Sequence, residues 1–164
     1  HVVISLVCES NPPLVCLKTF KGKNIMIVIH HNPECGTSRN VLKIIQDAGY
    51  NPTVIEYVKE GWSKAQLLGL FAAADLTPRM ALRTTQSPAE ELGLLDDTVT
   101  DDVLLDAMLK HPILVNRPIV CSPNGVKLCR PSEQVLDLLD QWPKGPYYKE
   151  DGALVIDEHG NRAL

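Results

Sequence analysis

An almost continuous run of apolar and β-branched residues, from Asn24 to His30, stands out in this 164-residue chain. Such a run is typical of a strand buried on both faces of a sheet. A turn-like segment follows it, and a helix is then predicted over 38–48, with Gly49 as its stop signal. Residues 53–58 carry a second strand pattern. Strand, helix and strand at this spacing predict a βαβ unit with parallel neighbouring strands.

Helical patterns fill the middle of the chain. Ser63, Thr77 and Thr100 are capping residues, and each precedes a predicted helix. The segment Ser87–Leu92 has a similar signature, with Pro88 in the first turn. The predicted helices cover residues 64–74, 78–82 and 101–110.

A hairpin pattern follows the helices. The short strand patterns 119–121 and 126–128 flank a Ser-Pro-Asn-Gly turn, which predicts an antiparallel pair. A last helix is predicted over 131–139. The chain beyond Trp142 is rich in Gly, Pro and charge, so a loose surface tail is expected from about residue 143.

The order of these elements is βαβ, several helices and then ββα. It predicts an α/β fold of the thioredoxin-like type, with a helical insertion between the two halves. The length suits about one domain, and we assign it to residues 24–164. Residues 1–23 are interpreted as an N-terminal appendage outside the fold, because Pro12-Pro13 interrupts them. The alternative is an extra edge strand over 2–7.

Composition and charge exclude several classes of protein. The chain has 16 Lys and Arg against 20 Asp and Glu, a net charge of −4, which disfavours binding to nucleic acid. No apolar run approaches the ~20 residues of a membrane span. Its five cysteines form no C-x-x-C pair and no zinc-finger spacing. We therefore expect no bound metal and a reducing, cytoplasmic setting.

The reactive chemistry is expected at Cys35. This residue follows a buried strand and directly precedes a helix, where free backbone N–H groups favour a thiolate. His31 lies four residues before it and Arg39 four residues after it, and a cation at either position would lower the thiol pKa further. Small polar residues surround it, including Ser38. The alternative is an inert buried cysteine.

The segment Cys35-Gly36-Thr37-Ser38 occupies the position of a C-x-x-C motif, but its last residue is serine. This segment cannot form the short disulfide of a thioredoxin. A second thiol must come from an external small molecule or from a distant residue such as Cys129. The sequence thus indicates a monothiol mechanism.

Three arginines are candidate anion ligands, because a guanidinium offers paired N–H donors to an oxyanion. Arg83 lies in the insertion, and Arg117 and Arg130 each precede a proline at an element boundary. The bond between Arg117 and Pro118 falls where thioredoxin-like folds place a cis-proline. Each arginine taken alone could equally be a surface residue or a helix-end contact.

Several segments together resemble the glutathione- and glutaredoxin-coupled arsenate reductases, in register from about Asn24 to about Asp157. They are His31–Asn40, Glu90–Leu94, His111–Val120 and Leu128–Glu133. The resemblance implies reduction of arsenate to arsenite on a thioredoxin-like fold. It also implies glutathione as co-substrate, glutaredoxin as partner and no bound cofactor. The segment before Asn24 has no counterpart in that family.

The resemblance also implies roles for individual residues. Cys35 is similar to the nucleophile of the family and His31 to the residue that promotes its thiolate. The oxyanion-binding positions correspond to Arg83, Arg117, Arg130, Ser38 and Arg39. Two alternatives stay open. One is a glutathione-dependent thiol oxidoreductase that does not act on arsenate, and the other is an RNA-polymerase-binding regulator of the Spx type.

Overall fold

The computed structural model describes residues 25–163. The expected appendage at residues 1–23, the alternative edge strand over 2–7, and Cys8 and Cys16 all lie outside the described residues. No helix within the described range is long and apolar enough to cross a membrane.

The first half of the fold is the predicted βαβ unit, made of β1 (Val28–His31), α3 (Gly36–Asp47) and β2 (Thr53–Glu56). Strands β1 and β2 pair in parallel, as expected. The helix ends where Gly49 takes a positive φ of 101°, a conformation that glycine adopts without strain.

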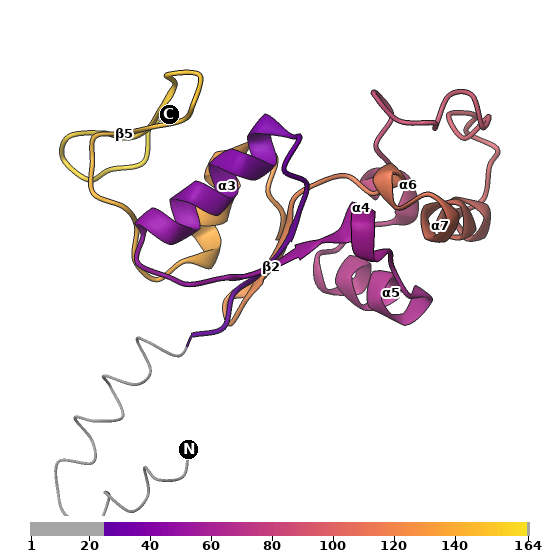
Figure 1. The fold of residues 1–164 in the computed structure, drawn as a ribbon, viewed down its shortest axis with the longest axis horizontal. Coiled ribbons are helices and arrows are strands. Elements are labelled where there is room, and N and C mark those ends of the chain that lie inside the picture. Colours follow the sequence, from indigo (N-terminus) through magenta and orange to yellow (C-terminus); the bar gives the residue numbers. More distant parts are fainter. Residues whose placement is uncertain (1–24, 164) are drawn as a thin grey trace, which may run out of the picture.

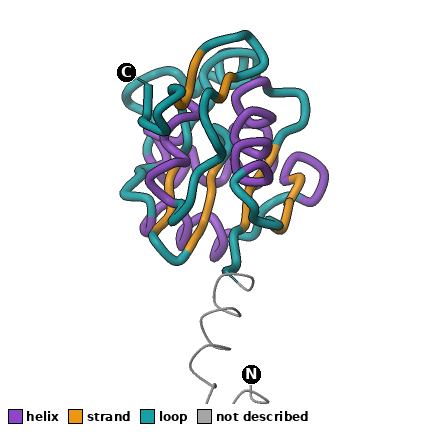
Figure 2. Tube along the Cα trace, turned by 90° about the vertical axis from the view of Figure 1, so that its left-hand side faces the viewer, coloured by secondary structure: helices purple, strands orange, loops and turns teal. Residues whose placement is uncertain are grey.

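The second half contributes the predicted hairpin, β3 (Ile119–Ser122) and β4 (Gly125–Leu128), with antiparallel pairing. Strand β3 pairs antiparallel with β1, so the four-stranded sheet has the order β2-β1-β3-β4. The chain returns to the sheet only after the insertion, so the two halves meet between β1 and β3. Figure 2 shows these strands running between helices on either side.

The insertion holds four α-helices and a short 3-10 turn, and it lies on the other side of the sheet from α3 (Figure 1). These elements are α4 (Tyr57–Glu60), α5 (Lys64–Ala73), α6 (Pro78–Ala81), α7 (Asp101–Lys110) and η1 (Pro112–Leu114). Ser63, Thr77 and Thr100 cap α5, α6 and α7 through side-chain oxygens that accept backbone N–H bonds, as predicted.

Two of the predictions within the insertion were wrong in detail. Strand β2 ends at Glu56, and Tyr57 and Val58 begin α4 instead of continuing the strand. The helical turn brings Tyr57 fully into the core, where its hydroxyl donates to the carbonyl of Val115. The segment Ser87–Leu92 forms turns and no regular helix, and Gly93 follows it at a φ of 72°.

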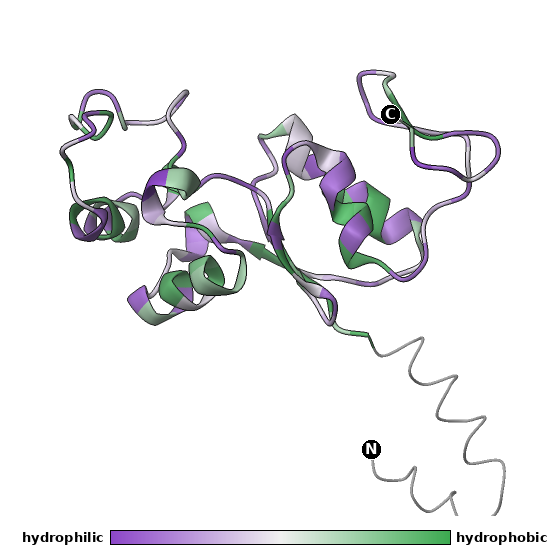
Figure 3. Cartoon of the chain, turned by 180° about the vertical axis from the view of Figure 1, so that it is seen from behind, coloured by the Kyte–Doolittle hydropathy of each residue, from purple (hydrophilic) through white to green (hydrophobic). Residues whose placement is uncertain are grey.

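Each face of the sheet carries its own apolar core. One core joins Ile29 and Val120 of the sheet to the apolar stripe of α3, and the other joins Ile119 to Tyr57 and the insertion helices. Figure 3 shows hydrophobic residues gathered on the strands, on one side of α3 and over α5. Burial on both faces explains why the chain is apolar up to Ile29, whereas β1 ends in the buried His30 and His31.

The C-terminal part differs from the expectation in two ways. The last helix is a 3-10 helix, η2 (Ser132–Leu138), and not an α-helix. The expected loose tail is packed: β5 (Tyr147–Tyr148) and β6 (Leu154–Ile156) pair antiparallel, and Val155 and Ile156 are fully buried beside α3. Two consecutive apolar residues anchor this otherwise polar segment.

Candidate active site

Cys35 lies at the N-terminal cap of α3, at the end of the loop that leaves β1. Its own N–H donates to the carbonyl of Asn32 at 3.0 Å, which closes the loop into a turn. The side chain is 7% exposed. No side-chain oxygen caps this helix, so the free N–H groups of its first turn are available to the sulfur.

The surroundings of Cys35 favour a thiolate. Burial alone would raise the pKa of Cys35, but the backbone N–H groups of Ser38 and Thr37, the charge of Arg117 and a bond from Arg130 outweigh it. The net result is a thiol pKa below its usual value. The predicted contribution of the helix terminus is therefore present.

Arg130 lies closest to the sulfur among the predicted arginines. Its Nη1 atom is 3.7 Å from the Sγ of Cys35 and donates to the carbonyl of Arg117 at 3.2 Å. Arg117 itself is only 8% exposed, and its Nε atom is buried with no hydrogen-bond partner. A buried, unpaired guanidinium N–H is costly unless a ligand accepts from it.

A pocket of about 430 Å³ opens beside Cys35. It is lined by Glu34, Cys35, Gly36, Thr37, Asn40, Gln86, Arg117, Arg130, Glu150 and Asp151. Two cations, a helix N-terminus and a nucleophilic sulfur thus face one space, a combination suited to a small oxyanion.

Arg83 is not among the residues that line this pocket. It is 8% exposed, and its Nε donates to the carbonyl of Thr85 while its Nη2 donates to Gln86, a pocket residue. Burial, and next the charge of Arg117, lower the pKa of Arg83. The structure therefore brings Arg117 and Arg130 into the pocket with the sulfur, whereas Arg83 contacts the pocket residue Gln86.

Backbone pairing fixes where these arginines lie. The N–H of Arg83 donates to Leu114 and that of Asn116 donates to Ala81, which links the insertion to the chain entering β3. The bond between Arg117 and Pro118 is cis, as predicted, and so is that between Arg130 and Pro131.

His31 and Ser38 form a buried pair beneath the loop. A hydrogen bond of 2.7 Å joins the Nδ1 of His31 to the Oγ of Ser38, which also accepts from the N–H of Asn32. Burial lowers the pKa of His31, which favours the neutral ring. The structure shows the ring holding the loop through Ser38, and the predicted effect of His31 on the thiol stays a prediction.

Arg39 is also engaged elsewhere. Its Nη2 and Nε donate to the two carboxylate oxygens of Glu150 at 2.7 and 3.2 Å, and its Nη1 donates to the carbonyl of Pro33. It is absent from the pocket lining and from the groups that lower the pKa of Cys35. The charge of Cys35 is nevertheless among the causes that raise the pKa of Arg39, after the bond to Glu150, so the action of Arg39 on the thiol stays a prediction.

Sequence reasoning missed Glu150 and Asp151, which reach the pocket from the C-terminal segment. No local pattern marks them, because an acidic pair in a polar tail is common. Asn40 and Gln86 also line the pocket and were missed, because no local pattern marks them either. Only the packing of β6 against the core shows that this segment lies over α3.

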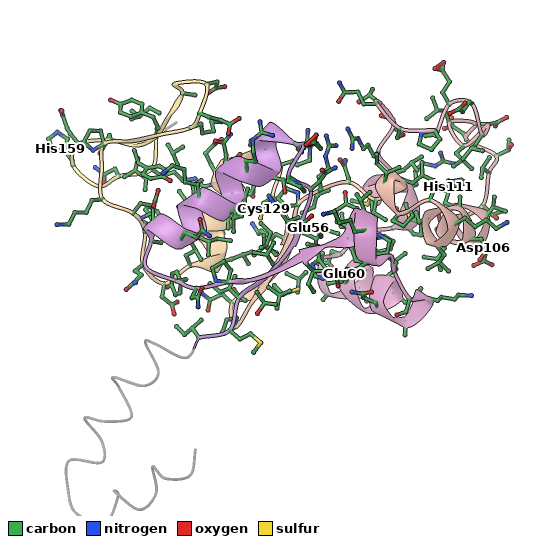
Figure 4. The ribbon with its side chains drawn as sticks, viewed as in Figure 1. Glu56, Glu60, Asp106, His111, Cys129 and His159 are labelled. Atoms are coloured by element: carbon green, nitrogen blue, oxygen red, sulfur yellow. The ribbon has the colours of Figure 1, made fainter. Side chains whose placement is uncertain are left out.

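The remaining cysteines of the described range are free thiols away from the pocket. Cys129 is fully buried, and burial raises its pKa to about 12, which makes its thiol inert as a nucleophile. Figure 4 shows Cys129 between α3 and the sheet, with His111 and His159 toward opposite ends of the molecule. Within residues 25–163, no three metal-ligating side chains lie together.

Comparison with known proteins gives the same family throughout. The family model of the ArsC family matches residues 30–138. Arsenate reductase ArsI2 of Synechocystis sp. is 76% identical over 137 residues, 84% of this chain and 98% of that protein. An arsenate reductase of Escherichia coli is 53% identical over 136 residues, 83% of this chain and 96% of that protein.

A solved structure agrees with these relatives. The arsenate reductase from Vibrio cholerae matches with a TM-score of 0.66 and 37% identity, over 70% of this chain and 98% of that chain. The predicted fold class is confirmed: the sheet order and the match together are those of a thioredoxin-like α/β fold with a helical insertion. On these grounds the chain belongs to the ArsC family.

Proposed function

We propose that this protein is an arsenate reductase that uses Cys35 as nucleophile and glutathione as the external reductant. The observation that carries the proposal is a thiol of lowered pKa, Cys35, facing a pocket with two arginines, in a chain 76% identical to an arsenate reductase. An anionic substrate would be repelled by a thiolate, and the guanidinium groups offset that repulsion.

The reaction begins when arsenate enters the pocket. Arg117 and Arg130 donate hydrogen bonds to its oxygens, and the unpaired Nε of Arg117 gains an acceptor. The Cys35 sulfur attacks arsenic and forms a sulfur–arsenic bond, while an arsenic–oxygen bond breaks and its oxygen leaves as water after protonation. Arsenic is still pentavalent in this adduct.

Reduction follows with a second thiol. The sulfur of glutathione attacks the Cys35 sulfur, a disulfide forms, and the electron pair of the sulfur–arsenic bond stays on arsenic. Arsenic becomes trivalent and leaves as arsenite, while the two thiols together lose the two electrons. Glutaredoxin then exchanges the mixed disulfide and returns Cys35 to its thiol.

Two observations within residues 25–163 support an external second thiol. Cys129 is buried with its pKa raised to about 12, and Ser38 stands where a dithiol motif would have its second cysteine. The free state of Cys35, Cys121 and Cys129 is in keeping with a reducing, cytoplasmic compartment.

The remaining residues act through others. His31 orients Ser38, and Ser38 holds the loop so that the backbone N–H groups of α3 face the sulfur. Arg83 adds positive charge that interacts with the charge of Cys35. The activity is proposed to reside in residues 24–164, so a chain starting at Asn24 should turn over as well as the full chain.

The test is arsenate turnover with purified protein, glutathione and glutaredoxin, followed as arsenite produced. Full activity is expected for the intact chain and for Cys121→Ser, and none above background for Cys35→Ser. Equal arsenite production by Cys35→Ser would overturn the proposal. Reduction of glutathione mixed disulfides without any arsenate reduction would favour a thiol oxidoreductase instead.

A further inference from the structure

The C-terminal segment places a carboxylate at an anion pocket, which is opposite to what anion binding alone would require. Glu150 lines the pocket beside Cys35. A Cβ atom added at Gly36, in the first turn of α3, would lie 3.4 Å from the Oε1 of Glu150. The carboxylate is therefore close to the helix N-terminus that also faces the sulfur.

This carboxylate neutralises the nearest cation at the rim. Both oxygens of Glu150 accept from Arg39, at 2.7 and 3.2 Å, which is the two-pronged pairing that guanidinium and carboxylate groups favour. The same Arg39 lies 3.6 Å from the Cβ position of Gly36. Without Glu150, Arg39 would be a third free cation at the mouth of the pocket.

The position of Glu150 is fixed from several sides. Its backbone N–H donates to the Oδ1 of Asn40 at 3.0 Å, on α3 itself. The neighbouring Lys149 pairs with Glu133 at 2.6 Å, and both side chains are largely buried. The segment then enters β6, whose Val155 and Ile156 are buried in the core. A flexible tail would not hold a charge at one place, whereas this one is anchored.

We infer that Glu150 is an affinity-setting residue that limits the binding of oxyanions in general to the Cys35 pocket, by neutralising Arg39 and adding negative charge to the rim. The inference rests on the proposed function of the pocket. Phosphate and arsenate share shape and charge, so arginines alone cannot separate them. A pocket of moderate affinity is not kept occupied by phosphate, and bond formation between sulfur and arsenic then selects arsenate.

The test compares the intact chain with Glu150→Gln, which removes the charge and keeps an oxygen that can accept from Arg39. Binding of inorganic phosphate is measured by calorimetry at low and at high salt. At low salt we expect about three- to tenfold tighter phosphate binding by Glu150→Gln, the effect of one unit charge near the pocket. The gain should shrink at high salt, because salt screens exposed charges.

Two further readings separate a charge effect from a structural one. In turnover, Glu150→Gln should show a lower KM for arsenate and stronger inhibition by phosphate, with little change in kcat. The pKa of Cys35, from alkylation against pH, should fall further. The charged groups that line the pocket are Arg117, Arg130, Glu34, Glu150 and Asp151. Arg39 and Arg83 also interact with the charge of Cys35, and only Glu150 is changed. Glu158→Gln is the matched control, since Glu158 is exposed and pairs only with His159.

The outcomes are distinct. If the intact chain binds phosphate and Glu150→Gln binds it no more tightly, this inference is overturned and the proposed function still stands. Absence of phosphate and arsenate binding in both proteins overturns the inference and the anion pocket together. A gain of equal size for Glu158→Gln also overturns it, since the effect would then be one of overall charge.

Discussion

At the scale of single residues, Arg117 and Arg130 are the side chains on which anion binding depends. Arg130 reaches the Cys35 sulfur and Arg117 is buried with an unpaired Nε. Lysine at either position keeps the charge but loses the planar fork. Loss of one charge-assisted hydrogen bond costs about 1.5–3 kcal/mol, so we expect a drop of roughly ten- to hundredfold in kcat/KM for arsenate.

Arg162→Lys is the matched control for these variants. Arg162 pairs with Asp137 outside the pocket, so its replacement should leave arsenate turnover unchanged even if melting shifts slightly. Retention of full kcat/KM by both Arg117→Lys and Arg130→Lys would show that the two arginines are structural.

The buried histidines predict a dependence of stability on pH. Burial lowers the pKa of both His30 and His31 below 6.5, so the unfolded chain binds more protons than the folded one in mildly acid solution. The contribution of the two neutral histidines to the free energy of unfolding is fully present above pH 6.5. It is lost as pH falls through their folded-state pKa values. Urea unfolding should therefore give a smaller free energy of unfolding near pH 5 than near pH 7. Both pH values lie above the ordinary pKa values of carboxyl groups. A free energy that is constant or larger near pH 5 would contradict this account.

Residue chemistry could be predicted from sequence only where it was local. The Cys35 thiolate followed from a helix terminus next to the cysteine. The partners of His31 and Arg39 did not follow, because Ser38 and Glu150 each offer a better contact than the thiol. Sequence separation gives no measure of such competition, and Glu150 is 111 residues away from Arg39.

At the scale of elements, the loop between β1 and α3 depends on Ser38. Its hydroxyl, fully buried, serves both the N–H of Asn32 and the ring of His31. Ser38→Ala leaves a buried donor without a partner, which costs about 1–3 kcal/mol. We expect that loss of unfolding free energy in urea, together with a rise in the pKa of Cys35 measured by alkylation.

Ser63→Ala tests whether the second effect is specific. Ser63 caps α5 on the surface, so its loss costs about 0.5–2 kcal/mol and should not move the pKa of Cys35. If Ser38→Ala lowered stability without changing that pKa, Ser38 would support the fold but not the thiolate.

Most elements followed from local signals, and the exceptions have physical reasons. Caps at Ser63 and Thr100 and the hairpin turn before Gly125 fixed their elements, because side-chain oxygens and turn residues act within a few positions. Tyr57 was misassigned because an aromatic residue after a strand suits both a strand and a buried helical turn. The choice depends on the distant carbonyl of Val115.

At the scale of the whole molecule, the C-terminal segment is part of the core. Ile156 is fully buried against the side of the sheet that carries α3. Ile156→Ala removes buried methyl groups and leaves a cavity, at a cost of about 2–5 kcal/mol of unfolding free energy. Leu154, two residues earlier and 39% exposed, is the matched control, and Leu154→Ala should cost well under half as much. Equally small losses of unfolding free energy in Ile156→Ala and Leu154→Ala would contradict this account and indicate a loose tail.

The sequence could not predict this packing. Gly, Pro and charge dominate residues 143–153, and Leu154-Val155-Ile156 is a run of only three aliphatic residues. A three-residue strand has no periodicity to read, and its core partners in α3 are distant in the chain. The two halves of the sheet were predictable, by contrast, because each is a local motif.

The central claim is that one thiol, Cys35, reduces arsenate with an external thiol as its partner. A single turnover with arsenate and glutathione, without glutaredoxin, tests this most directly when the protein is analysed by intact mass and peptide mapping. We predict one glutathione per chain, in a disulfide with Cys35, and one equivalent of arsenite. A disulfide between Cys35 and another cysteine of the chain, or arsenite formed while Cys35 stays unmodified, would contradict the account.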